Sequence, residues 1–347
     1  MNECNIVYSI IMPVYNSGQF LDIAVKSILN QDFNDFELIL VDDGSSDGSS
    51  ERCDFFAEQD ERVVVIHQQN RGMGFARNKA IKTARGQYIG FCDHDDEFMQ
   101  SCLSRCFEII SKEKVDVIKF GCKELYLKWD NIIRTRELTY RENKLFKDGE
   151  QADAFLYKFD CDYMAYIWDG FYKKELFCSG IFFNEDMRTG YEDEDVLVRI
   201  FEQMKSIFFM NEIYYIHNIR QELSSSKKHN NNQLNAMYTA LNAEIKVSSN
   251  LGVPQLDPAF PEAFVGKNLE TAFRCIVYDL KSKPRLKAKE IYDTPVIRNH
   301  LKKYQIRRVF EKKSTWGVLY TLFSMRMFGV IDLLARMFRI KYGLKKK

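Results

Sequence analysis

The sequence predicts an α/β protein, with a mixed, mostly parallel sheet flanked by helices and a helical extension at its C-terminal end. Three observations lead to this prediction. Strand and helix signals alternate through about the first 120 residues, which is typical of βαβ units. Two acidic clusters, 42–47 and 93–96, each follow a short apolar run. After Ile219 the strand signals stop and only helical patterns follow.

Composition narrows the class of protein. The chain has 347 residues and is 46% hydrophobic, which is enough for one large core and an accessory domain. The net charge of +1 gives no bias toward nucleic acid, so we expect no nucleic-acid partner. Nine cysteines form no CxxC pair and no zinc-like cluster, which favours a reducing compartment. With no secretory signal and no spanning segment in the sequence, we expect a cytoplasmic protein.

The elements of the first part can be placed in order. We expect strands at 7–12, 36–41, 63–66, 87–92 and 115–121. Apolar residues of 21–29 recur at helical spacing, the polar turn 44–48 is suited to capping the next helix, and a small-residue helix covers 73–84.

The rest of the chain is read more coarsely. Residues 123–145 are polar and alternating, so they form a strand pair or an excursion over the sheet. We expect helices at 148–159 and 191–204, short strands at 207–210 and 213–216, and a loop at 224–232. Helices then follow at 233–250, 261–281, 298–311 and 315–340.

The acidic clusters indicate a metal and a phosphate ligand. In a parallel sheet, strand ends of the same polarity lie along one edge, where ligands bind. Carboxylates, water and phosphate oxygens are the ligands that Mg²⁺ and Mn²⁺ prefer. Asp93 and Asp95 lie two residues apart at a strand end, so both carboxylates can approach one ion. The alternative is an acidic loop that is simply solvated.

Five segments together resemble the family 2 glycosyltransferases, and they occur in that family's order: 11–16, 41–47, Asn70 with Gly72 and 76–78, 86–89, and 93–96. The resemblance covers roughly residues 5–220. It implies a Rossmann-like GT-A fold, an inverting transfer, a nucleotide-diphosphate sugar donor, with a UDP-sugar as the first expectation, and Mn²⁺ or Mg²⁺ as cofactor.

The resemblance also divides the chain. Residues 1–122 would be the nucleotide-sugar-binding half of the GT-A domain and residues 123–220 the acceptor-binding half. Residues 221–347 would be a helical extension with a basic amphipathic tail.

Donor-side residues follow from the matched motifs. Pro13, Tyr15, Asp42 and Asp43 are expected to contact the nucleotide, since a carboxylate can accept hydrogen bonds from a uracil N–H or a ribose hydroxyl. Asp93 and Asp95 are the implied metal ligands. Arg77 would bind the donor, because its planar guanidinium suits phosphate, or would hold the metal loop by an ion pair.

Acceptor-side residues are less sharply defined. Aligning Glu192 and Asp193 on the family's Glu-Asp motif makes Asp193 the catalytic base, and a second register would make it Asp195. Both acids also suit a helix N-terminus. Trp168 would stack on an acceptor sugar, or it would pack in the core.

The end of the chain carries a different signal. From Trp316 onward, apolar residues recur at helical spacing, and arginines and lysines lie among and after them. Such a helix can bind an anionic membrane surface, which would suit a lipid-linked saccharide acceptor. The alternatives are a helix that closes the C-terminal domain and one that packs on a second subunit.

Three functions are compatible with these residues. The first is an inverting transferase acting on a saccharide or lipid-linked acceptor in surface-polysaccharide synthesis, peripheral on the inner face of the cell membrane. The second is a catalytically inactive scaffold that binds a nucleotide sugar in a synthase complex. The third is a sugar nucleotidyltransferase, which the sequence disfavours because residues 13–18 contain no glycine-rich phosphate loop.

Overall fold

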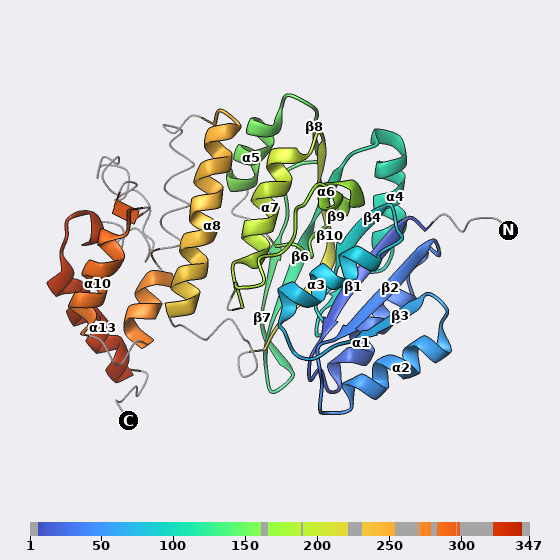
Figure 1. The fold of residues 1–347 in the computed structure, drawn as a ribbon, viewed down its shortest axis with the longest axis horizontal. Coiled ribbons are helices and arrows are strands. Elements are labelled where there is room, and N and C mark those ends of the chain that lie inside the picture. The colour runs from blue at the N-terminus through green and yellow to red at the C-terminus, as the bar shows by residue number, and fades with distance from the viewer. Residues whose placement is uncertain are drawn as a thin grey trace. The chain divides into compact units, whose positions relative to one another are not determined.

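The computed structural model describes residues 6–160, 166–188, 190–220, 231–253, 269, 271–278, 283–295, 297–298 and 322–341. The chain forms two compact units (Figure 1). The first contains Met1–Arg188 and Glu192–Ser224, and the second contains Thr189–Tyr191 and Ser225–Lys347. Each unit is described by itself.

The first unit begins with a parallel sheet in the order β3-β2-β1-β4. Its strands are β1 (Tyr8–Val14), β2 (Phe36–Asp42), β3 (Val63–His67) and β4 (Tyr88–Phe91). The connecting helices are α1 (Phe20–Leu29), α2 (Ser49–Gln59) and α3 (Met73–Thr83). Every residue of β1 and β2 is buried, because helices cover both faces of the sheet. The four strands and the three helices lie where the sequence predicted them.

The second half of the sheet is mixed. Its strands are β5 (Glu97–Phe98), β6 (Val117–Lys128), β7 (Asn131–Leu138), β8 (Lys144–Phe146), β9 (Gly170–Lys173) and β10 (Ile207–Arg220). β9 pairs antiparallel with both β4 and β6, and β10 pairs parallel with β6. It follows that β1, β2, β4, β6 and β10 all end at the same edge of the sheet.

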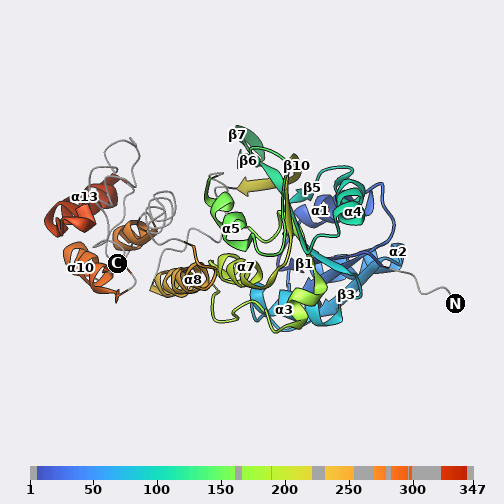
Figure 2. The same ribbon diagram turned by 90° about the horizontal axis from the view of Figure 1, so that it is seen from above.

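Helices cover the two faces of this sheet. They include α4 (Cys102–Glu113), α5 (Gln151–Asp160), α6 (Lys174–Cys178) and α7 (Glu192–Gln203). α1, α2 and α4 lie on one face, and α3 and α7 lie on the other (Figure 2). The mixed α/β architecture predicted from the sequence is confirmed.

Several predictions for the second half need refinement. The polar stretch 123–145 is indeed a strand pair, the β6–β7 hairpin, followed by β8. The two short strands expected at 207–210 and 213–216 are one long strand, β10, with register irregularities after Phe209. Helix α4 and strand β9 were not predicted. In α4 two of the buried positions are cysteines, Cys102 and Cys106, which act there as small hydrophobic residues.

One glycine shows how tightly the halves of the sheet are packed. A Cβ atom on Gly90 of β4 would lie 2.4 Å from the ring of Phe171 in β9. That ring also contacts Tyr8, Phe98 and Phe120. Only glycine leaves room for the aromatic cluster that joins β4 to the second half of the sheet.

The second unit is helical in its described part. It contains α8 (Asn231–Asn250), α10 (Pro284–Asp293) and α13 (Phe328–Lys341), and residues 271–278 are also helical. α8 agrees with the prediction, α10 was not predicted, and most of the helix expected at 298–311 lies outside the described residues. Within the described residues, no helix is both long enough and apolar enough to cross a membrane.

Candidate functional site

Asp43 organises the loop beyond β2. Its Oδ1 accepts hydrogen bonds from Gln68 Nε2 and the Arg71 backbone N–H, both at 2.8 Å, and its Oδ2 accepts one from the Gly72 N–H at 2.8 Å. The residue is 4% exposed. Asp43 therefore ties the end of β2 to the start of α3, and two backbone N–H groups fix the direction of its carboxylate.

Asp42 belongs to a second small network. It accepts hydrogen bonds from the Ser45 N–H at 2.9 Å and from His67 Nδ1 at 3.0 Å, and the other His67 nitrogen lies 2.9 Å from Asp54. Burial opposes ionisation of Asp42, but the hydrogen bonds from His67 and Ser45 hold its pKa below the usual value. Asp42 and Asp54 in turn raise the pKa of His67.

The other two expected nucleotide contacts lie at the end of β1. Pro13 is buried and pairs in register with Val41 of β2. Tyr15, two residues further on, is 48% exposed. Of these two residues, Tyr15 has the side chain that a ligand at this edge of the sheet can reach.

The second acidic cluster forms a pinned loop after β4. Asp96 is buried, and it accepts hydrogen bonds from the Tyr215 hydroxyl at 2.9 Å and the Asn218 N–H at 2.7 Å. Burial raises the pKa of Asp96 well above its ordinary value. The partly exposed Asp95 pairs with Arg220 at 3.1 Å. Residues toward the C-terminal end of β10 therefore hold this loop in place.

Arg77 joins the two sides of the site. The side chain is 1% exposed, and it places Nη2 3.0 Å from Asp93 Oδ1 and Nη1 2.7 Å from Asp193 Oδ1. Glu192 Oε1 lies 3.5 Å from the same Nη1. Asp93 follows β4, whereas the other two acids begin α7, so one guanidinium gathers carboxylates from distant parts of the chain.

The surroundings distinguish the two candidate bases. Burial raises the pKa of Asp193, while the Arg77 charge opposes this rise and the Asp93 charge adds to it. Burial and the Asp193 charge raise the pKa of Glu192 to about 7. Asp195 instead pairs with Arg199 of its own helix at 2.5 Å. Of the two candidates, Asp193 is the one that the structure brings to the Arg77 cluster.

The residues present suit a divalent cation bound together with a phosphate ligand. Across the part of the chain that the structure describes, no three His, Cys, Asp or Glu side chains gather into a metal site. Asp93 and Asp95 each have one oxygen engaged by an arginine, which leaves the other oxygen for an ion. Mg²⁺ is commonly held by one or two carboxylates plus phosphate oxygens and water, and this donor set matches that pattern.

Trp168 does not lie as an acceptor-stacking residue would. It is 2% exposed, and its ring is stacked between Tyr166 at 4.3 Å and Tyr215 at 4.2 Å. Both faces of the indole are therefore covered, and the expected stacking of a sugar on Trp168 does not fit this geometry. Because the hydroxyl of Tyr215 holds Asp96, Trp168 acts instead as packing behind the acidic loop.

Several residues of the site were not found from the sequence. Arg220 and Asn218 end β10 and hold the acidic loop, and Lys119 binds Asp169 and the Tyr166 carbonyl beneath the aromatic stack. None of them belongs to a short motif. The roles of these three residues depend on pairings between distant strands, for which the sequence carries no local signal. Glu192 was aligned on the family's Glu-Asp motif and considered as a helix-capping acid, but its contact with Arg77 was not predicted.

Comparison with known proteins identifies the family. The model of Glycosyl transferase family 2 matches residues 9–176. The chain is 33% identical over 218 residues to the glycosyltransferase GlyG of Streptococcus pneumoniae, which covers 61% of this chain and 70% of GlyG. It is 34% identical over 211 residues to the uncharacterized glycosyltransferase EpsJ of Bacillus subtilis, which covers 60% of each chain. The chain belongs to the family 2 glycosyltransferases.

Solved structures agree on the fold. Residues 1–349 of S. aureus TarS, crystallised with UDP, superpose with a TM-score of 0.60 at 17% identity, over 98% of this chain and 93% of that one. The complex of the same protein with UDP-GlcNAc also gives a TM-score of 0.60, at 18% identity, over 96% and 92% of the two chains. The fold is the GT-A fold that the sequence resemblance implied.

Proposed function

We propose that this enzyme transfers a sugar from a UDP-sugar, with inversion, to a hydroxyl of a saccharide or lipid-linked saccharide during the synthesis of a bacterial surface polysaccharide. TarS, which has the same fold, was crystallised with UDP and with UDP-GlcNAc. A further relative, 28% identical over 228 residues, is the minor teichoic acid biosynthesis protein GgaA of Bacillus subtilis. The TarS complexes favour a UDP-sugar donor, and the likeness to GgaA favours a cell-surface polymer.

The observation that carries the proposal is the position of Arg77. It contacts Asp93 with one nitrogen and Asp193 with another. Asp93 lies on the donor side, at the edge where β1, β2 and β4 end, and Asp193 begins α7 on the acceptor side. A transferase needs its leaving-group site and its base close together, on opposite sides of the anomeric carbon. Two carboxylates held by one guanidinium meet this need.

The proposed reaction is a single displacement. The acceptor oxygen forms a bond to the anomeric carbon while the bond from that carbon to the diphosphate oxygen breaks, and the bonding pair leaves with the UDP. The hydroxyl proton passes to Asp193. Its raised pKa makes this carboxylate a stronger base than an exposed aspartate. A bound Mn²⁺ or Mg²⁺, held by Asp93 and Asp95, would neutralise charge on the diphosphate.

The nucleotide would lie against the loops that follow β1 and β2. Tyr15 offers an exposed ring for the base, and Asp43 offers a carboxylate whose direction is fixed by backbone N–H groups. A preorganised acceptor of this kind recognises an N–H or a hydroxyl with little loss of side-chain entropy.

Contact with an anionic membrane at the inner face of the cell is part of the proposal. The apolar stripe expected from the sequence is only partly available for it, because Phe323 and Ile331 are buried inside the second unit. Helix α13 has another stripe, however. Leu333, Met337 and Ile340 are exposed and follow one another at helical spacing, close to basic residues of the same helix.

A thermal-shift panel tests the donor and the metal together. UDP, GDP, CDP and ADP are added with and without Mn²⁺ to the wild type, to Asp95→Ala and to Asp153→Ala, which removes an exposed acid from α5 as a control. A ligand at a hundredfold excess over its dissociation constant stabilises the native state by about 2.7 kcal/mol. UDP should shift the wild type and the control only with Mn²⁺, and it should not shift Asp95→Ala.

Three outcomes would contradict the proposal. If no diphosphate shifts the wild type, the chain does not bind the expected donor. If UDP-sugars bind but neither hydrolysis nor transfer occurs with any acceptor, the chain is a nucleotide-sugar-binding scaffold. Release of pyrophosphate from a nucleoside triphosphate and a sugar phosphate would instead make it a nucleotidyltransferase.

A further inference from the structure

The tip of the β6–β7 hairpin has an unusual composition. Two residues, Trp129 and Asp130, form its turn, and both have positive φ angles, 50° and 60°. Turns of this kind favour Asn and Gly, because other side chains are strained in the left-handed region. Trp129 is 75% exposed, so its bulky side chain gains little packing within the chain to offset that strain. A residue that is unfavourable in its own turn, and that gains no packing in return, is expected mainly where it serves a function.

The next residues continue the apolar surface. Ile132 and Ile133, at the start of β7, are 56% and 54% exposed. The register of the hairpin shifts between Tyr126 and Leu127, and this irregularity leaves Ile133 as an extra residue on the β7 side. An aromatic and two β-branched side chains thus lie together at the end of one projecting hairpin, where a soluble surface would normally be polar.

Basic side chains flank this tip. Residues 128–136 contain the cations Lys128, Arg134 and Arg136 and a single carboxylate, that of Asp130. Lys128 and Arg134 are exposed. An apolar end with a cationic collar is complementary to a membrane that carries anionic head groups, because tryptophan favours the interface and the cations favour the lipid phosphates.

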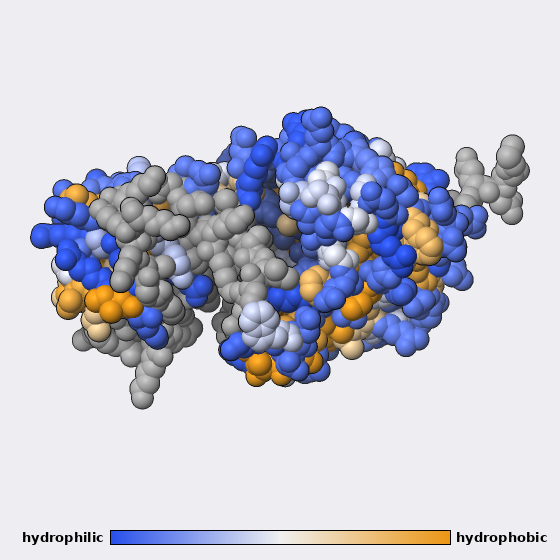
Figure 3. Space-filling model, turned by 90° about the horizontal axis from the view of Figure 1, so that it is seen from below, coloured by the Kyte–Doolittle hydropathy of each residue, from blue (hydrophilic) through white to orange (hydrophobic). Residues whose placement is uncertain are grey.

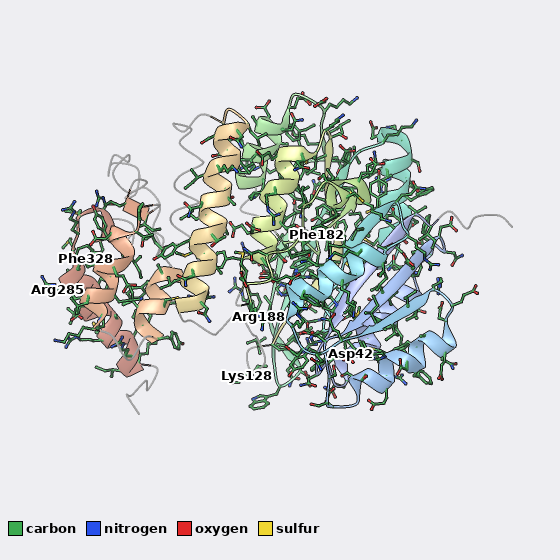
Figure 4. The ribbon with its side chains drawn as sticks, in the orientation of Figure 1. Asp42, Lys128, Phe182, Arg188, Arg285 and Phe328 are labelled. Carbon is green, nitrogen blue, oxygen red and sulfur yellow. The ribbon has the colours of Figure 1, made fainter. Side chains whose placement is uncertain are left out.

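The hairpin projects from the edge of the sheet that carries the site. Leu127 pairs in register with Arg220, the residue that holds Asp95. The tip therefore begins at Lys128, one residue past the position where Arg220 holds the acidic loop. In Figure 1 the turn between β6 and β7 points to the bottom of the view, and Figure 4 labels Lys128 there. Figure 3 shows the molecule from that side, with apolar surface in orange among hydrophilic residues.

We propose that the hairpin tip inserts Trp129, Ile132 and Ile133 into the interface of an anionic membrane, with Lys128 and Arg134 on the lipid phosphates. Only the purpose of this membrane binding, which is to bring a lipid-linked acceptor to the site, rests on the proposed function. Membrane binding by the tip does not depend on the transfer reaction. It is also separate from the stripe of α13, which belongs to the other unit.

The test uses the full chain and sedimented vesicles of phosphatidylcholine, with or without phosphatidylglycerol. The tip variant Trp129→Ser/Ile132→Thr/Ile133→Thr should bind the anionic vesicles much more weakly than the wild type does. The control Ile23→Thr/Leu286→Thr removes equally exposed apolar side chains elsewhere and should bind like the wild type. Lys128→Gln/Arg134→Gln should lower the partition coefficient by about fivefold for each cation, the equivalent of about 1 kcal/mol per charge near such a surface.

A second measurement reports insertion directly. In the Trp316→Phe variant, the remaining tryptophans are the exposed Trp129 and the buried Trp168. Lipids brominated on their chains should quench the fluorescence of this variant, and the additional change Trp129→Phe should abolish the quenching. A variant of the α13 stripe, Leu333→Ser/Met337→Ser/Ile340→Ser, should keep the quenching.

Three results would overturn the inference. The first is a tip variant that binds anionic vesicles as strongly as the wild type does, and the second is a wild type that binds none. The third is a concentration-dependent dimer that the tip variant loses, which would make the tip an interface with a second copy. Donor hydrolysis and thermal unfolding are followed in parallel. The tip variant should retain both, so a failure of the donor site cannot be mistaken for a failure of the tip.

Discussion

The two sides of the site hold their carboxylates in different ways. On the proposed donor side, Asp43 is held by three N–H donors from residues 25 to 29 positions away, two of them backbone groups. On the proposed acceptor side, Asp193 is held at 2.7 Å by Arg77, which is 116 positions away, and at 3.4 Å by the Ile167 N–H. The first arrangement is built from a βαβ unit and its loops, and the second depends largely on one buried cation.

This difference predicts different sensitivities. A carboxylate held by several backbone donors keeps its direction when a neighbouring side chain is changed. A cluster of acids around one guanidinium loses its charge balance when that group is removed, because buried carboxylates are then left unpaired. We therefore expect the acceptor side to fail first and the donor side to tolerate substitutions better.

The largest effect is expected for Arg77→Ala. Removal of the buried guanidinium leaves Asp93, Asp193 and Glu192 without their shared cation, and loss of one partner of a buried pair costs about 3–5 kcal/mol. Sugar transfer should become undetectable, and the free energy of unfolding in urea should fall by about this amount. Arg77→Lys should recover part of the stability but little of the transfer, since an ammonium group cannot bridge the acids with a planar fork.

A matched control separates burial from charge. Arg105 pairs with Glu108 and Glu212 but is partly exposed. Its replacement by alanine should cost about 1 kcal/mol or less. Similar losses for Arg77→Ala and Arg105→Ala would show that the Arg77 cluster is not the centre of the acceptor side.

The second prediction concerns the base. Asp193→Asn should reduce the rate of transfer by about 10²- to 10⁴-fold, the usual contribution of a general base, while UDP-sugar binding is retained. Asp195→Asn should leave transfer within a few-fold of the wild type, because this acid serves the Arg199 pair instead. Single-turnover transfer with a fixed acceptor is the appropriate measurement. The reverse ranking of the two variants would assign the base to Asp195.

The same contrast explains what the sequence could predict. The strands and helices of residues 7–91 each have their own local pattern, and the acidic clusters follow apolar strands, so their positions could be read directly. Strand β9 is only four residues long and is defined by its pairing with β4 and β6, and β10 depends on β6 in the same way. Such long-range pairing has no local signal.

The site residues divide along the same line. Asp42, Asp43, Asp93 and Asp95 could be proposed because they belong to compact motifs. Arg220 could not, because its role arises only when the end of β10 reaches the acidic loop. For Trp168 the sequence left acceptor stacking and core packing open, because exposure cannot be read from a single aromatic residue. Only the stack with Tyr166 and Tyr215 shows that its ring is covered.

The third prediction tests the donor side, whose carboxylate is held by residues nearby in the sequence. Asp43→Asn keeps the shape of the side chain but turns an amide N–H₂ toward backbone donors, so at least one of the three hydrogen bonds is lost. The free energy of unfolding should fall by about 1–3 kcal/mol. UDP binding, measured by calorimetry, should weaken by about tenfold. The fold should remain intact, with an unchanged circular dichroism spectrum, whereas a globally unfolded variant would show that the donor side is as fragile as the Arg77 cluster.

The smallest effect, and the one that probes the acceptor side without breaking it, is on pH dependence. Burial and the Asp193 charge raise the pKa of Glu192 to about 7. The native state therefore binds this proton more tightly than the unfolded state, so the contribution of Glu192 to stability is complete below its ordinary pKa and is lost as the pH rises toward 7. Glu192→Gln should flatten the fall in the free energy of unfolding over this window, and it should stabilise the protein relative to wild type at higher pH.

The exposed Glu108→Gln serves as the control and should leave the slope unchanged. Equal slopes of the free energy of unfolding against pH for Glu192→Gln and the wild type would mean that Arg77 keeps Glu192 ionised throughout. Burial and the Asp193 charge would then destabilise the ionised form of Glu192 less than we expect.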